Sequence, residues 1–71
     1  MKENNLMNFP EKLKELRLSH NLTQQQLAKL IEIHPTTYRN YESGKTVPRV
    51  SVIRKLVITL NVTCDELLGL D

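Results

Sequence analysis

Residues 22–45 read LTQQQLAKLIEIHPTTYRNYESGK and carry the strongest structural signals of the chain. Thr23 and Gln26 have the spacing of a capping box, in which each of the two side chains bonds a free backbone amide at the start of a helix. They predict a helix over residues 24–31. Pro35 suits the first turn of a helix and Gly44 suits its end, which predicts a second helix over residues 35–43. Two short helices joined by a tight link are therefore expected.

Residues 35–43, placed at steps of about 100° per residue, divide into two faces. Tyr38 and Tyr41 share one face, with Glu42 at its margin, and this face is predicted to pack on the preceding helix. The opposite face is polar and carries Thr36, Arg39, Asn40 and Ser43, with Thr37 at its edge. Short polar side chains and one long cation are what readout of base edges in the DNA major groove requires. The alternative interpretation is a solvated face, but two short helices joined by a tight link match the helix-turn-helix unit.

The remaining residues predict three more helices, near 9–20, 49–60 and 64–69. Pro10 and Pro48 mark two of their starts, a second capping box at Thr63 and Glu66 marks the third, and Asn21 and Asn61 mark two of their ends. Residues 52–62 also alternate like a strand, but a helical stripe that persists for two turns favours helix. The sequence thus predicts an all-α, five-helix domain over residues 9–71, preceded by a flexible arm at residues 1–8.

Composition and charge limit the class of protein. A chain of 71 residues allows one domain, and its basic groups gather in residues 24–55, whereas residues 56–71 carry three acidic groups and no basic one. No apolar run is long enough for a membrane segment, and the single Cys64 is expected to be a partly buried thiol without a disulfide, so a cytoplasmic protein is expected. The chain has no clustered His, Cys and carboxylate pattern, which predicts no enzyme, no cofactor, no small-molecule substrate and no metal site.

Residues 11–69 resemble the small DNA-binding domain of phage repressors and Cro proteins, the Xre-type helix-turn-helix family. The resemblance rests on the joint spacing of Leu13-x-x-Leu16-Arg17, Leu22-Thr23-Gln24-x-x-Leu27-Ala28, Tyr38-x-x-Tyr41-Glu42-x-Gly44-Lys45, Pro48 and Leu60-Asn61-Val62-x-x-x-Glu66-Leu67-Leu68. It implies a lambda-repressor-like fold and a sequence-specific transcriptional regulator encoded by a bacterium or a resident phage. Such a protein binds a double-stranded DNA operator, usually as a homodimer, with the helix at residues 35–43 in the major groove.

The resemblance also implies roles for individual residues. The base-reading positions are Pro35, Thr36, Thr37, Arg39 and Asn40. The phosphate-contacting positions are Gln24, Ser43, Lys45 and Arg49. Arg17 and Glu42 correspond to a buried structural ion pair between the first and third helices. The family's usual Gly in the turn before the third helix is Glu32 here, and a positive φ at a non-Gly residue costs about 1 kcal/mol.

The alternative function is a protein-interaction module of the same fold, such as an antitoxin or an adaptor. Ile58 lies about 140° from the apolar stripe of its helix and is therefore expected to be exposed. With Leu67 or Leu70 it is predicted to form an apolar patch on the surface. The simplest partner for such a patch is a second copy of the chain, so we expect a homodimer on a palindromic operator.

Overall fold

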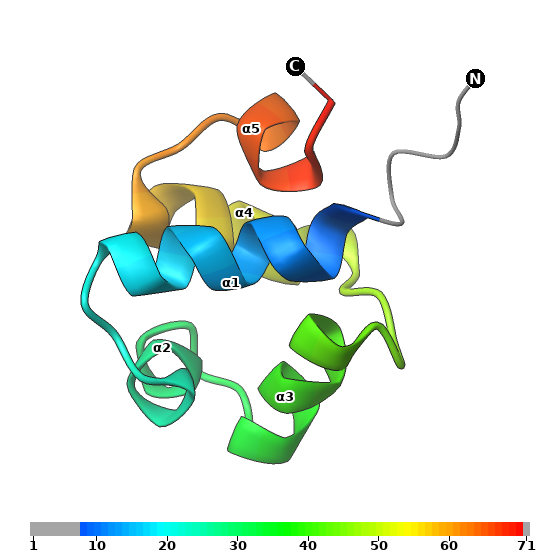
Figure 1. Cartoon of the computed structure of the whole chain (residues 1–71). Coiled ribbons are helices and arrows are strands. Elements are labelled where there is room, and N and C mark those ends of the chain that lie inside the picture. Colours follow the sequence, from blue (N-terminus) through cyan, green and yellow to red (C-terminus); the bar gives the residue numbers. More distant parts are fainter. Residues whose placement is uncertain (1–7, 71) are drawn as a thin grey trace.

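Five helices joined by short links make up the described part of the chain (Figure 1). The computed structural model describes residues 8–70. The helices are α1 (Phe9–Ser19), α2 (Gln24–Leu30), α3 (Pro35–Ser43), α4 (Val50–Leu60) and α5 (Cys64–Leu68). Residues 8–70 contain no strand, so the five-helix prediction is confirmed and the strand interpretation of residues 52–62 is wrong. The predicted flexible arm, apart from Asn8, lies outside the described residues.

Helix α1 runs through the middle of the molecule in Figure 1, with α5 on one side and the pair α2–α3 on the other. It packs against both α3 and α5, while α2 packs against α3 and α4 packs against α5. The pair α2–α3 therefore forms one end of the molecule. No helix within residues 8–70 has the length and apolar character needed to cross a bilayer.

Every helix contributes at least one side chain to a single apolar core. The buried members are Phe9, Leu13, Leu27, Ala28, Ile31, Tyr38, Tyr41, Leu56, Leu60 and Leu67. The placement of Leu67 in a dimer interface is therefore wrong, because its side chain is 0% exposed. Leu67 is the buried residue of the very short α5 and anchors that helix to the core. Ile58 and Leu70, the other two members of the predicted patch, are 75% and 48% exposed.

Local capping signals account for the starts of α2 and α5, and both predicted capping boxes are confirmed. The hydroxyl of Thr23 accepts the amide of Gln26 at 3.0 Å, and the Gln26 side chain accepts the amide of Thr23 at 2.8 Å. Thr63 and Glu66 make the same two bonds at 3.0 and 2.9 Å. Cys64, the first residue of α5, is exposed rather than partly buried, because the cap leaves the outer side of this first turn in solvent.

Candidate nucleic-acid interface

The turn between α2 and α3 sets the relation of the two helices. Ile33 donates its amide to the carbonyl of Ala28 at 3.0 Å, and its partly buried side chain packs on the core. Ala28 is fully buried, so no larger side chain keeps the helices apart. His34 precedes α3 and caps it, because its Nδ1 accepts the amide of Thr36 at 3.1 Å. Pro35 then opens α3 without needing an amide partner.

Glu32 in this turn has a left-handed backbone conformation. Its φ is +63°, close to the values of +59° and +56° at Asn21 and Asn61, where other helices end. Asn tolerates this conformation better than Glu does, so the strain expected from Glu at a family Gly position is present here. Lys55 of α4 contacts this turn, with Nζ 3.3 Å from Oε1 of Glu32.

The inner face of α3 is buried in the core. Tyr38 is 0% exposed and Tyr41 is 7% exposed, and both belong to the buried cluster that includes Leu27 and Ile31. The two rings meet edge to face, with centroids 6.5 Å apart and planes at 76°. This is a favoured geometry for aromatic pairs. The burial of both rings in the core fixes the rotation of α3 about its own axis.

Glu42 joins three helices through one carboxylate. Its Oε2 lies 2.6 Å from Nε of Arg17, and its Oε1 lies 3.2 Å from Nη2 of the same guanidinium. The Tyr38 hydroxyl donates to Oε2, and Nε2 of Gln24 donates to Oε1 at 3.0 Å. The guanidinium also donates to the carbonyl of Leu22 at 2.8 Å. The side chains of Arg17 and Glu42 are only 8% and 5% exposed, so this is a buried and bidentate ion pair.

The hydrogen bonds of this network stabilise the charged forms of Arg17 and Glu42. Burial by itself favours a neutral carboxyl, but the bonds from Arg17, Tyr38 and Gln24 outweigh it and hold the pKa of Glu42 below its usual value. The hydrogen bond to Glu42 raises the pKa of the Arg17 guanidinium. Burial raises the pKa of the Tyr38 phenol. At neutral pH the network therefore consists of a carboxylate, a guanidinium and a neutral phenol.

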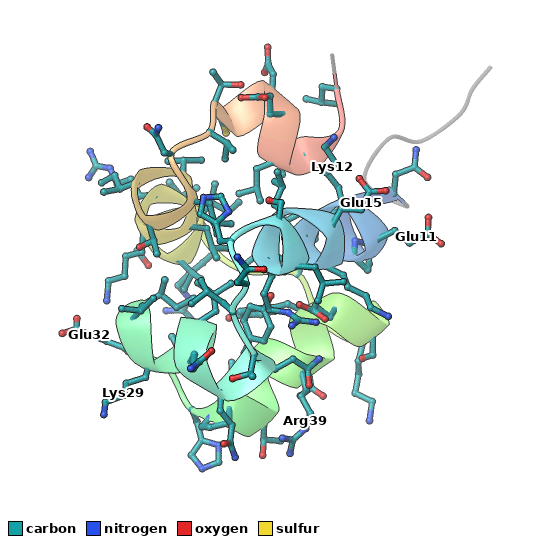
Figure 2. All side chains as sticks on the ribbon, turned by 60° about the vertical axis from the view of Figure 1, so that its left-hand side comes forward. Glu11, Lys12, Glu15, Lys29, Glu32 and Arg39 are labelled. Carbon is teal, nitrogen blue, oxygen red and sulfur yellow. The ribbon has the colours of Figure 1, made fainter. Side chains whose placement is uncertain are left out.

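The outer face of α3 is turned to solvent. Thr36, Thr37, Arg39 and Ser43 are exposed, and Asn40 is half-buried. Figure 2 shows Arg39 pointing away from the body of the molecule, and its Nη2 donates to the hydroxyl of Thr36 at 3.2 Å. Within residues 8–70 the side-chain amide of Asn40 makes no hydrogen bond to the protein. Such a face can offer hydrogen bonds to an external partner.

The residues expected at phosphates fall into two groups. Gln24 and Ser43 already bond within the protein, since Gln24 holds Glu42 and the Ser43 hydroxyl donates to the carbonyl of Asn40 at 3.2 Å. Lys45 and Arg49 are exposed and follow the C-terminal end of α3, and Arg49 is the residue that precedes α4. Pro35 is half-buried at the other end of α3. The expected base-reading positions thus share one helix, and the expected phosphate positions lie near its C-terminal end.

Sequence reasoning missed two contacts of this site. Tyr38 lies four residues before Glu42, so the helical spacing itself is a signal that its hydroxyl reaches the carboxylate. The contact of Lys55 with the turn has no such signal, because the two partners are more than 20 residues apart in sequence.

Known proteins resemble the chain over most of its length. Residues 13–67 match the sequence profile of the helix-turn-helix family. The chain is 42% identical over 63 residues to the HTH-type transcriptional activator BcrR of Enterococcus faecalis, covering 89% of this chain and 31% of that protein. It is 41% identical over 59 residues to the HTH-type transcriptional regulator AnsR of Bacillus subtilis, covering 83% and 51%. It is 38% identical over 63 residues to the cryptic phage CTXphi transcriptional repressor RstR of Vibrio cholerae, covering 89% and 56%.

The chain spans about a third to just over half of the length of these relatives, whose names describe regulators of transcription and no enzyme. No solved structure matches it significantly. The family match covers most of the chain and includes the α2–turn–α3 unit. The chain therefore belongs to the Xre/Cro/C1-type helix-turn-helix family.

Proposed function

We propose that this domain is a sequence-specific DNA-binding transcriptional regulator that inserts α3 into the major groove of an operator. The observation that carries the proposal is the division of α3 into two faces. One face is buried and locked by Glu42, and the other presents solvent-exposed hydrogen-bonding side chains. A helix built in this way approaches base edges closely without disturbing its own core.

Each outer side chain has a partner that its chemistry favours. The amide of Asn40 matches the two hydrogen-bonding groups of an adenine edge, and Arg39 matches those of guanine. The methyl groups of Thr36 and Thr37 suit the methyl group of thymine, and Pro35 adds an apolar contact at the tip of α3. Gln24, Ser43, Lys45 and Arg49 flank these positions and are proposed to hold phosphates, which sets register and adds salt-dependent affinity.

The exposed Ile58 and Leu70 support a homodimer. A two-fold pair places two copies of α3 about 34 Å apart, one turn of the DNA helix, which suits a palindromic operator. The relatives include a named activator and a named repressor, so the proposal covers both directions of regulation.

The test is a selection of bound duplexes from a random library, followed by salt titrations on the selected duplex and a scrambled one. Asn40→Ala is expected to cost about 1–3 kcal/mol on the selected duplex and little on the scrambled one, because it removes a base contact. Lys45→Ala is expected to weaken both duplexes alike and to reduce the salt slope by about one per subunit.

Lys12→Ala is the matched control for Lys45→Ala. Lys12 carries the same charge but lies near α5, at the opposite end of the molecule from Arg39 (Figure 2). Its removal is expected to leave the salt slope unchanged. If the wild-type protein shows no preference for any duplex at physiological salt, the regulator proposal is wrong and the protein-interaction module becomes the better explanation of the fold.

A further inference from the structure

The turn between α2 and α3 contains a carbonyl oxygen that has no backbone donor. In a continuing helix, the amide of residue 35 would bond the carbonyl oxygen of Ile31. Residue 35 is a proline, which has no amide hydrogen. The next residue after Ile31 is Glu32, whose positive φ turns the chain away from α2. The turn therefore combines backbone strain with an acceptor that the helices leave open.

Lys55 supplies the missing donor from α4. Its Nζ lies 3.4 Å from the carbonyl oxygen of Ile31 and 3.3 Å from Oε1 of Glu32. Within the described part of the chain, these are the only side-chain hydrogen bonds that α4 makes to the pair α2–α3. A single ammonium group thus ties α4 to the turn.

The contact with the carbonyl matters more than the ion pair. The side chains of Lys55 and Glu32 are 46% and 77% exposed, and ion pairs at such sites contribute little. The carbonyl of Ile31 lies at the C-terminal end of α2, where the aligned peptide dipoles favour a cation. Lys55 therefore acts on the backbone of the turn itself.

The direction of α3 depends on this turn. Four residues, 31–34, separate the last residue of α2 from the first of α3, so a change in the backbone of Glu32 swings α3 relative to α2. The Glu42 network fixes the rotation of α3 at its C-terminal end but touches none of these four residues. The N-terminal end of α3, where Thr36 and Thr37 lie, is held by the buried ring of Tyr38 and by the turn.

We propose that Lys55 is a positioning residue that fixes the α2–α3 turn and thereby aims the N-terminal end of α3, without itself touching DNA. The DNA part of this inference rests on the proposed function. The structural part does not, and it can be measured on the protein alone. The rival role for an exposed lysine of this domain is a phosphate contact, which the experiment separates.

The first experiment is native-state hydrogen exchange on the free protein. The amide of Ile33, which bonds Ala28 across the turn, reports local opening. Lys55→Met keeps the apolar stem and removes the ammonium, and it is expected to speed exchange at Ile33 about two- to fivefold, the worth of a cation at a helix end. Lys55→Arg is expected to restore most of the protection. Arg54→Met removes the same charge from the neighbouring exposed position of α4 and is the matched control, expected to leave Ile33 unchanged.

A background without strain sharpens the test. In Glu32→Gly the turn residue tolerates positive φ and the carboxylate partner of Lys55 is gone, but the Ile31 carbonyl remains, so Lys55→Met is still expected to speed Ile33 exchange about two- to fivefold. Unchanged exchange at Ile33 in Lys55→Met, or an equal increase in Arg54→Met, overturns the structural part of the proposal. Loss of the effect in the Glu32→Gly background shows that Lys55 acts through the ion pair with Glu32 and not through the Ile31 carbonyl, and overturns it as well.

The second experiment measures binding to the selected and scrambled duplexes. Lys55→Met is expected to weaken the selected duplex about two- to fivefold, to leave the scrambled duplex and the salt slope unchanged, and to be rescued by Lys55→Arg. A salt slope reduced by about one, with both duplexes weakened alike, identifies a phosphate contact and overturns the proposal. If the wild type prefers no duplex, the proposed function fails, while the exchange at Ile33 still decides whether Lys55 holds the turn.

Discussion

Replacing Glu42 by Ala tests the central polar network of the domain. The substitution removes the acceptor of four hydrogen bonds at once. The Arg17 guanidinium keeps its bond to the carbonyl of Leu22 but loses its counter-charge, with a side chain only 8% exposed. The hydroxyl of the fully buried Tyr38 loses its acceptor. The variant thus leaves a buried charge without its counter-charge and a buried hydroxyl without its acceptor.

The expected loss is large on the scale of the whole domain. Breaking a buried ion pair by removing one partner costs about 3–5 kcal/mol. Small domains have a total free energy of unfolding near the low end of about 5–15 kcal/mol. With a urea m-value of about 1 kcal/mol/M for a chain of this size, the unfolding midpoint is expected to fall by about 3 M or more. The variant is therefore expected to be close to half unfolded in mild denaturant.

Urea unfolding followed by far-ultraviolet circular dichroism measures this loss, and two further variants show its origin. Tyr38→Phe removes one hydrogen bond but leaves the ion pair, so its loss is expected to be about 1 kcal/mol. Arg17→Met combined with Glu42→Leu removes both charges and is expected to regain much of what Glu42→Ala loses. A loss below about 0.5 kcal/mol for Glu42→Ala would refute the reasoning. A double variant that is less stable than Glu42→Ala would also refute it. The loss in Glu42→Ala could not then be caused by the buried charge that Arg17 keeps without a counter-charge.

Three further predictions follow from the same structure. Because the pKa of Glu42 is lower in the folded than in the unfolded chain, its contribution is present above the unfolded value of about 4.3 and is lost as pH falls through the folded value. The stability gap between wild type and Glu42→Gln, measured by urea unfolding, is accordingly expected to narrow below pH of about 4. His34→Ala removes the side-chain cap of α3 and is expected to cost about 1 kcal/mol, with His34→Asn restoring it, whereas equal stability of all three proteins argues against the cap. Ile58→Asp places a charge in the proposed dimer surface and is expected to shift sedimentation towards monomer, and a wild type that is monomeric at high concentration contradicts the homodimer.

Features that depend on neighbours in sequence were predictable. The capping boxes at Thr23 and Thr63 set the starts of their helices because both bonds of a box form within four residues. The position of Glu42 at the margin of the buried face of α3 was predictable from helical periodicity, since Tyr38 and Tyr41 define that face. The left-handed Glu32 followed from its position after a helix where the family has Gly.

Features that depend on very short or distant segments were not predictable. A helix as short as α5 offers too few positions for periodicity to define a buried face, so the sequence pattern does not show that Leu67 is buried. The cap at Thr63 marked the start of that helix but gave no information on how Cys64 is exposed. The contact of Lys55 with Ile31 arises only when α4 packs beside the turn, which no local pattern of residues records.

The two faces of α3 also bear on how a domain of this kind diverges. Selection for a folded protein acts on Tyr38, Tyr41 and Glu42, whose side chains are enclosed and bonded. It hardly acts on the side chains at positions 36, 37, 39 and 43, which add almost nothing to the core. In the proposed DNA-binding function, one copy can change these outer residues one at a time after a gene duplication and acquire a new target, while its core stays intact. Binding specificity would then change without any change in the residues that stabilise the fold.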